Sequence, residues 1–290
     1  MTFRHLEIFI KVAETLSMTA AAESLFIAQP SVSQSVSELE QHLKTRLFER
    51  LGRRLFLTES GVELLSYARH IVALTFEAER RMHDRHRGGS LRIGGSMTVG
   101  TTILNSLIKK INSRIPECRV TVRVDNTSAL EKMLLNDELD IAFAEGNMKS
   151  EHIVFRVMMD DELLLVCPAG HRFSGREYIA PDELASENFI IREEGSGTRE
   201  LFESVMLAHG IEFRCAGVMN NAEAIKLAVA DGLGLSVLSS LSVHREIERG
   251  ELSALRVDGV NFVRHFSVFH HRNKFITPVM EEFMDLCEEI

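Results

Sequence analysis

The chain lacks any long apolar run. Nowhere in its 290 residues do about 18 apolar residues follow one another, so no membrane-spanning helix is expected. The first residues, MTFRHLEIF, lack the apolar core of a secretory signal peptide. Cysteine is sparse and scattered, without the close spacing of a zinc site or a redox pair, at Cys118, Cys167, Cys215 and Cys287. These features favour a cytoplasmic protein with reduced thiols.

A net positive charge is also lacking, because the whole chain carries −9. The distribution is uneven. Residues 1–90 carry 12 Lys/Arg and 11 Asp/Glu, whereas the remaining 200 residues carry 21 and 31. A locally basic cluster in the first part contains a single acid, Glu49, among Lys44, Arg46, Arg50, Arg53 and Arg54. The acidic total therefore does not exclude nucleic acid as a partner of the N-terminal part.

The stretch AQPSVSQSVSELEQHL, residues 28–43, is rich in serine and glutamine. Val32, Val36, Leu39 and Leu43 recur at the spacing of one helix face, so the stretch is predicted to be a helix with Pro30 in its first turn. Two shorter amphipathic helices are predicted before it, over residues 3–15 and through AAAESL. The short hydroxyl and amide side chains of the opposite face suit close entry into a DNA major groove.

The segment LFERLGRRLFLTESG, residues 47–61, is predicted to form a short hairpin around Gly52. Arg50, Arg53 and Arg54 lie near its tip, and Leu55 and Leu57 return to the core. A basic hairpin beside a recognition helix is typical of a wing that contacts phosphates or the minor groove.

Residues 9–61 resemble the winged helix-turn-helix of the LysR-type transcriptional regulators. The terms AAESL, QPSVSQ, LFER and LTESG occur with that family's spacing. The resemblance implies double-stranded DNA and RNA polymerase as partners, and DNA contacts in the helix and the wing at Gln29, Pro30, Ser31, Ser33, Gln34, Arg50 and Arg53, beside Arg54. Many members carry arginine where this chain has Gln34, so the base preference at that position does not transfer.

A long helix is predicted from about Glu59 to Arg85, because apolar residues recur along it every three or four positions, at Val62, Leu65, Ala68, Val72 and Phe76. Such a helix outside a compact domain usually pairs with another helix. The resemblance makes it the linker of a homodimer or homotetramer. Gly88 and Gly89 then form a natural hinge.

The remaining 200 residues alternate strands and helices. LRIGG is predicted as a strand, residues 101–114 as a helix, and ELLLVCP as a later strand. This order predicts a mostly parallel sheet with helices on both faces, which binds ligands beyond the carboxyl ends of its strands.

Three loops rich in hydroxyl groups fall at such strand ends, in GSMTVGTT, DNTS and EEGSGTR. Helix N-termini with free N–H groups favour anions. We therefore expect a pocket for a small anion, made by Ser96, Thr98, Thr101, Thr127, Ser128, Ser196 and Thr198.

The family resemblance extends through this half, in LRIG, LEKMLLNDELDIAFAEG, GSGTR and AIKLAVADGLGLSVLS. It implies an α/β effector-binding domain of two Rossmann-like subdomains, similar to periplasmic binding proteins. The expected boundaries are residues 1–58 for the DNA-binding domain, 59–89 for the linker and 90–290 for the effector domain. Within the last, subdomain I takes about 90–160 and 266–290, and subdomain II about 161–265.

No enzyme is expected. Thr101 stands where a P-loop has its lysine, and the glycines around Ser196 are not spaced as in a nucleophile elbow. GLGLSV lacks the third glycine of a dinucleotide motif. His270 and His271 would point to opposite faces of a strand, so no catalytic residue, metal site or cofactor is predicted.

The function predicted from these features is a sequence-specific DNA-binding regulator, controlled by a small anionic metabolite bound between the two subdomains. Two alternatives stay open. One is a thiol- or metal-responsive regulator on the same scaffold, since Cys167 and Cys215 can meet in the fold despite their separation in sequence. The other is a cytoplasmic solute-binding protein.

Overall fold

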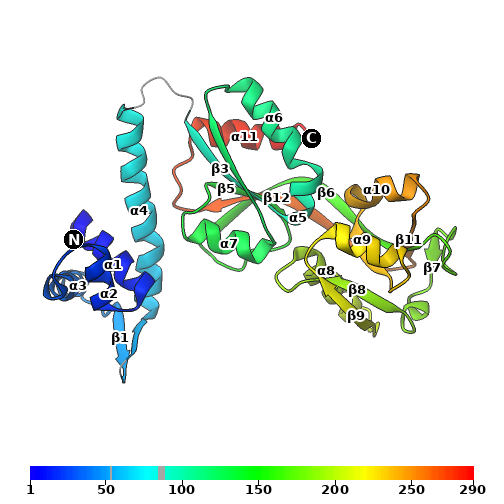
Figure 1. Ribbon diagram of the computed structural model, residues 1–290, viewed down its shortest axis with the longest axis horizontal. Helices are drawn as coiled ribbons and strands as arrows, with labels where there is room; N and C mark the ends of the chain where they lie inside the picture. Colours follow the sequence, from blue (N-terminus) through cyan, green and yellow to red (C-terminus); the bar gives the residue numbers. More distant parts are fainter. Residues whose placement is uncertain (53, 84–88) are drawn as a thin grey trace. The chain divides into compact units, whose positions relative to one another are not determined.

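The computed structural model describes residues 1–52, 54–83 and 89–290 (Figure 1). By compactness the chain divides into two units. Unit 1 holds Met1–Arg87 with the short segments Leu135–Asp137 and Asn273–Phe275, and unit 2 holds the rest.

Unit 1 is a small helical core followed by a hairpin and a long helix. Its elements are α1 (Phe3–Thr15), α2 (Met18–Ser24), α3 (Gln29–Leu43), β1 (Phe48–Leu51), β2 (Arg54–Leu57) and α4 (Glu59–His83). Helix α3 begins at Gln29 with Pro30 in its first turn, and Val32, Val36 and Leu39 bury its apolar face. The helix predicted from the valine spacing is therefore confirmed.

The hairpin is held to α3 by one carboxylate. Glu40 Oε1 accepts hydrogen bonds from the backbone N–H groups of Leu47 at 2.7 Å and Phe48 at 3.1 Å. Both of these residues are buried. At the turn, Gly52 has a φ of +66°, which favours glycine.

The apolar stripe predicted for helix α4 is divided between solvent and core, with Val62 and Phe76 exposed. Ala68 is fully buried, and Leu65 and Val72 pack against the core of unit 1. The predicted apolar stripe thus belongs partly to the chain's own core. A second set of apolar side chains on α4 is exposed, including Ile71 and Leu74.

Unit 2 contains an eight-stranded sheet and a separate parallel pair of strands, β8 with β9. The main path of the eight-stranded sheet is β4-β3-β5-β12-β6-β11-β7, and β10 pairs with β6. The pairs of β3 with β4 and β5 are parallel, but β12 runs antiparallel to both β5 and β6. The prediction of a mostly parallel sheet was wrong, because β6 and β12 run in opposite directions and make the sheet mixed.

The elements of unit 2 are β3 (Ser90–Gly95), α5 (Met97–Thr102), α6 (Leu104–Arg114), β4 (Arg119–Val124), α7 (Thr127–Leu135), β5 (Ile141–Glu145), β6 (Ile153–Pro168), β7 (Tyr178–Ile179), the 3₁₀ helix η1 (Pro181–Leu184), β8 (Asn188–Arg192), α8 (Gly197–Ala208), β9 (Arg214–Met219), α9 (Ala222–Ala230), β10 (Ser236–Ser239), α10 (Ser240–Glu248), β11 (Leu252–Val257), β12 (Val263–His271) and α11 (Pro278–Glu288).

Two lobes of unit 2 form around separate hydrophobic cores. The first core lies between β3, β5 and the helices α6 and α11, with Phe143, Phe266 and Phe283 at its centre. The second lies among β6, β8, β11 and α8, around Phe189 and Phe202. Strand β6 contributes side chains to both cores, with Met158 and Met159 against the first and Leu163 and Leu165 in the second, and so connects the lobes (Figure 1).

The helix expected over residues 101–114 is two helices. Helix α5 begins at Met97, directly after β3, and α6 begins at Leu104. The sequence of α5, MTVGTT, contains a glycine and three threonines, which are weak helix formers, so the pattern did not indicate it. Ser96 caps α5 by accepting from Val99 N at 3.2 Å.

Candidate functional site

The predicted recognition helix presents its polar residues to solvent. On α3, Gln29, Pro30, Ser31, Ser33 and Gln34 are all exposed, while the valines of the opposite face are buried. The helix N-cap, Ala28, makes no side-chain cap. Pro30 has no N–H group and Ser31 N donates to Ala28 O at 3.0 Å, so in the first turn the N–H of Gln29 is the group that can contact a phosphate.

Gln34 has a partner within its own helix. Its Nε2 donates to Glu38 Oε1 at 2.8 Å. Reading a base with the Gln34 amide therefore requires this intrahelical bond to be exchanged for one to DNA.

The wing arginines lie on the hairpin. Arg50 and Arg54 are exposed, on β1 and β2 respectively. Arg53 lies outside the described residues. The hairpin that carries these arginines follows α3 in the sequence. Glu40 of α3 holds it in place through the backbone N–H groups of Leu47 and Phe48.

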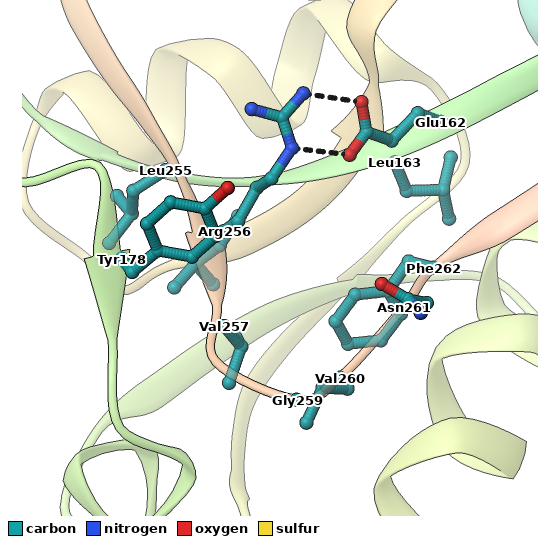
Figure 2. A pocket seen from close by; sticks show the side chains of 11 residues that line it. Glu162, Leu163, Tyr178, Leu255, Arg256, Val257, Gly259, Val260, Asn261 and Phe262 are labelled. Carbon is teal, nitrogen blue, oxygen red and sulfur yellow. Dashed lines mark hydrogen bonds and ion pairs between the residues drawn. The ribbon is translucent and has the colours of Figure 1, made fainter.

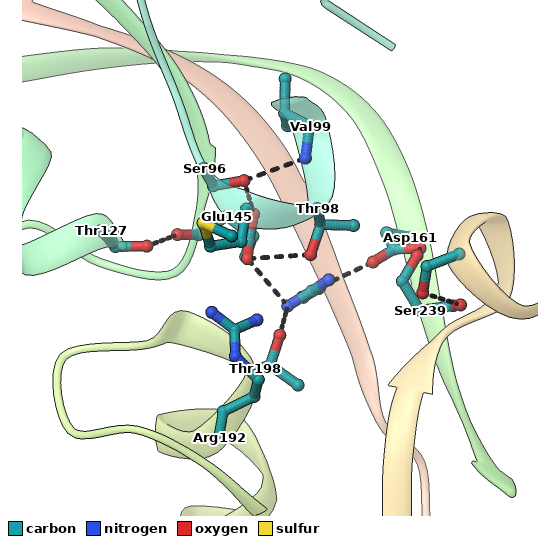
Figure 3. A network of polar contacts seen from close by, with 12 residues as sticks. Ser96, Thr98, Val99, Thr127, Glu145, Asp161, Arg192, Thr198 and Ser239 are labelled. Atoms are coloured by element: carbon teal, nitrogen blue, oxygen red, sulfur yellow. Dashed lines mark hydrogen bonds and ion pairs between the residues drawn. The ribbon is translucent and has the colours of Figure 1, made fainter. Parts of the chain in front are cut away.

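Four of the predicted effector residues converge in unit 2, but on a side chain that the sequence did not indicate (Figure 3). The carboxylate of Glu145, at the end of β5, accepts a hydrogen bond from Ser96 and another from Thr98 Oγ1 at 3.3 Å. Thr127 Oγ1 donates to the Glu145 backbone oxygen at 2.9 Å. Thr198 joins this network from the other lobe, through Arg264.

Arg264 of β12 connects the two lobes. Its Nη1 donates to Thr198 Oγ1 at 2.8 Å and lies 3.6 Å from Glu145 Oε1. Its Nε donates to Asp161 Oδ2 at 2.7 Å, and Ser239 Oγ donates to Asp161 Oδ1, also at 2.7 Å. Burial raises the pKa of Asp161 above its ordinary value, and the Arg264 charge and the Ser239 hydrogen bond offset part of that effect.

Two donors at this place are buried and have no hydrogen-bond partner among the described residues. They are Ser196 Oγ and Arg264 Nη2. Ser196 is 2 % exposed and is the N-cap of α8, yet its side chain makes no capping bond. A buried polar group without a partner costs free energy, so these two atoms indicate a ligand or ordered water.

The loops of the two lobes touch through their backbones. Ser128 N donates to Gly195 O at 3.2 Å. A Cβ at Gly197 would lie 2.9 Å from Glu145 O, so only glycine permits this approach. A cavity of about 640 Å³ opens beside this contact and is lined by Thr127, Ser128, Ser196, Lys132, Lys149 and Arg199, among others.

Thr101 is not brought together with the other predicted residues. It is exposed, and its hydroxyl donates to the Met97 and Thr98 carbonyls of its own helix at 2.9 and 3.1 Å. Sequence reasoning also missed the charged centre, Glu145, Asp161 and Arg264. The only signal available was a charged residue inside or at the end of an otherwise apolar strand, as in IAFAE.

A second cavity, of about 260 Å³, lies in the second lobe and holds none of the predicted residues (Figure 2). Arg256 and Glu162 stand at its rim, joined by hydrogen bonds of 2.6 and 2.7 Å. Its walls are mostly core side chains such as Leu163, Val257 and Phe262. Among the described residues, none that line it has a buried polar atom without a hydrogen-bond partner, unlike Ser196 and Arg264 in the cleft between the lobes.

Within residues 1–52, 54–83 and 89–290, no group of three His, Cys, Asp or Glu side chains is placed to hold a metal ion. Over the same described ranges, none of the helices has the length and apolar character needed to span a membrane.

Comparison with known proteins covers the whole chain. Residues 3–62 match the bacterial regulatory helix-turn-helix protein of the lysR family, and residues 84–290 match the LysR substrate binding domain. The HTH-type transcriptional regulator YeiE of Escherichia coli strain K12 is 33% identical over 288 residues, which is 99% of this chain and 97% of YeiE.

Two solved structures are similar as well. The regulatory domain of CcmR from Synechocystis PCC6803, in complex with 2-PG, is 26% identical, with a TM-score of 0.65 over 69% of this chain and 96% of that domain. Full-length CbnR complexed with its target DNA has a TM-score of 0.61 over 100% of this chain and 99% of CbnR, at 23% identity, and therefore supports the fold alone. The predicted fold class, a winged helix-turn-helix and linker helix followed by an α/β effector domain, is confirmed. The chain belongs to the LysR family of DNA-binding transcriptional regulators, which are not enzymes.

Proposed function

We propose that this regulator is controlled by a small anion bound in the cleft between the two lobes of unit 2. One observation carries the proposal: Ser196 Oγ at the N-terminus of α8 is buried without a partner among the described residues, two positions before Thr198, which accepts a hydrogen bond from Arg264. The Ser196 hydroxyl and the Arg264 guanidinium both donate hydrogen bonds, and a helix N-terminus adds favourable potential for negative charge.

The donors that sequence reasoning assigned to the effector are mostly occupied in this structure. Ser96 and Thr98 donate to Glu145, and Thr198 accepts from Arg264. We propose that a bound anion engages Ser196 and Arg264 directly, while Ser96, Thr98 and Thr127 hold Glu145 in place. Ser128 lines the cavity beside them.

The size of the cavity supports a compact ligand, whereas the charges of its lining are balanced. The cavity of about 640 Å³ carries Lys132, Lys149 and Arg199 in its lining, against Glu194, Glu200 and Glu203. The buried centre already holds two carboxylates for one guanidinium, so positive charge there is limited. The relative CcmR was solved with 2-PG, and this fits a small ligand in the same kind of domain.

Effector binding would act through the connection between the lobes. Because Arg264 bonds residues of both lobes, an anion that takes over one of its partners changes the balance between two lobe arrangements. In a homodimer or homotetramer, that change would alter the spacing of half-sites or the bend of the DNA. We propose that this happens in the cytoplasm, where bacterial DNA lies, with RNA polymerase as the further partner.

A thermal-shift screen of the full chain tests the proposal, with 2-PG, inorganic phosphate, sulfate and small mono- and dicarboxylates as ligands. An effector at about 100 times its dissociation constant should add about 2.7 kcal/mol to the free energy of unfolding. Ser196→Ala should leave the stability of the free protein unchanged or raise it, because Ser196 Oγ has no protein partner. The same change should weaken effector binding about tenfold, since it removes a hydrogen bond to a charged group.

The matched control is Ser236→Ala in the same lobe. Ser236 is also 2 % exposed, but its hydroxyl donates to Ile190 O at 2.8 Å. This change should lower stability and leave effector affinity unaltered. If no anion raises the unfolding midpoint, or if Ser196→Ala binds the effector as the natural chain does, the anion site is not here.

A further inference from the structure

The turn between α2 and α3 contains a residue in an unfavourable backbone conformation. Phe26 has a φ of +55°. Around it, Phe26 N donates to Glu23 O at 3.2 Å and Ile27 N to Ala22 O at 3.0 Å, which is the bonding pattern of a Schellman helix end. Glycine or asparagine normally occupies the left-handed position of this motif, because a Cβ is strained there.

The ring of Phe26 is not used by the fold either. It is 95% exposed, the highest value among the exposed large hydrophobic side chains of the described residues. Its neighbours Leu25 and Ile27 pack against the core of unit 1. An asparagine at position 26 would relieve the backbone and remove an exposed aromatic ring, so neither local stability nor packing explains the phenylalanine.

The position of Phe26 suggests what the ring contacts. It lies two residues before Ala28, which is the N-cap of α3 and the first residue of an exposed run through Ser31. In a helix-turn-helix, the first helix crosses the DNA backbone and the N-terminal residues of the second enter the major groove. The turn between them therefore faces the sugar–phosphate strand at the edge of that groove.

We propose that Phe26 packs its ring against the deoxyribose of the DNA backbone where α3 enters the groove. The sugar is the apolar part of that strand. The uncharged phenyl ring has no electrostatic attraction to a phosphate, so the sugar is its expected contact. The contact positions α3 on the duplex and reads no sequence. The inference rests on α3 being the helix that enters the groove.

The experiment compares Phe26→Asn, Phe26→Tyr and the natural full-length chain. DNA affinity is measured over a salt series, on a duplex that the natural chain selects from a random library and on an unrelated duplex. Phe26→Asn should bind both duplexes about tenfold more weakly, from the lost apolar burial. Its unfolding midpoint should be equal or higher, because the left-handed backbone is relieved. Phe26→Tyr keeps the ring and should retain affinity.

The salt dependence separates this contact from a phosphate contact. Replacing Phe26 removes no cation, so the slope of log K against log salt should not change. The matched control is Leu16→Asn: Leu16 also has a positive φ, +47°, at the end of α1 and is 44% exposed. It should gain or keep stability in the same way, with DNA affinity unaltered.

Three results would overturn the proposal. If Phe26→Asn binds DNA with unchanged affinity, the exposed ring does not contact DNA and contacts a protein partner instead. A loss confined to the selected duplex would mean that Phe26 reads a base. If Gln29→Ala has no effect on the selected duplex while Phe26→Asn weakens binding, α3 is not the reading helix and the placement of the ring fails with it.

Discussion

Three of the four cysteines are buried, which bears on thiol control of the regulator. Cys118, Cys167 and Cys287 are buried, and Cys215 on β9 is exposed. Burial and the nearby carboxylate of Glu187 raise the pKa of Cys167 to about 11. Burial likewise raises the pKa of Cys287. Because the thiolate is the reactive form, these buried thiols are poor sensors of peroxide.

Thiol labelling checks this directly. At pH 8 a thiol with a pKa near 11 is ionised in about one molecule in a thousand, so DTNB should react rapidly with one thiol per native chain. Unfolding in guanidinium should expose all four. The Cys215→Ser variant should show no rapid reaction when native. Rapid reaction of two or more thiols in the native chain would restore the thiol-responsive alternative.

At the scale of elements, helices with a periodic apolar face were predictable from the sequence, whereas the pairing of distant strands was not. The spacing of Val32, Val36 and Leu39 is enough to place α3, because a helix face depends on near neighbours in the chain. The strands β6 and β12 pair residues about a hundred positions apart, such as Asp161 with Arg264. No local pattern contains that register, so the mixed sheet could not be predicted.

The effector cleft shows the same limit. The hydroxyl loops were predictable from their position at strand ends, but their partner Glu145 appears in sequence only as the last residue of an apolar strand. Arg264 meets Glu145 and Thr198 only through the antiparallel crossing of β12. The sequence thus identified the hydroxyl side chains of the cleft, but not their hydrogen-bond partners Glu145 and Arg264.

The attachment of the wing to α3 is an element-scale device that mutation can test. Glu40→Ala removes the acceptor of two backbone N–H groups, those of the buried residues Leu47 and Phe48. Leaving buried donors unsatisfied should lower the free energy of unfolding of unit 1 by about 1–3 kcal/mol. Urea denaturation of the full chain followed by circular dichroism measures this, and DNA affinity should fall as the wing loses its position.

The control for Glu40 is Glu14→Ala. Glu14 is an exposed partner of Lys11 on α1, at 2.6 Å, and bonds no buried backbone group. Surface pairs of this kind contribute little, so its stability should change by less than about 0.5 kcal/mol. Equal effects of the two changes would show that the wing does not depend on the Glu40 carboxylate.

At the scale of the whole molecule, the exposed face of α4 supports self-association. Ile71 is 41% exposed and Leu74 is 45% exposed, three residues apart on one face of the helix, while Ala68 and Val72, four residues apart, pack against the core of unit 1. A long helix that keeps an apolar face in water is typical of one that pairs with a second copy. Dimerisation would present two α3 helices to two half-sites.

We expect Ile71→Glu to separate the dimer, because a charge in the centre of a paired apolar face costs far more than one at its rim. Sedimentation at micromolar protein should show monomers, and DNA affinity should fall about a hundredfold, since the second recognition helix is no longer held at high local concentration. Val62→Glu is the matched control: Val62 is 59% exposed on the same helix, but nine residues away and so about 180° around it. That variant should remain associated. A dimer that persists in Ile71→Glu, with unchanged DNA affinity, would show that association uses another surface and that the exposed face of α4 serves a different contact.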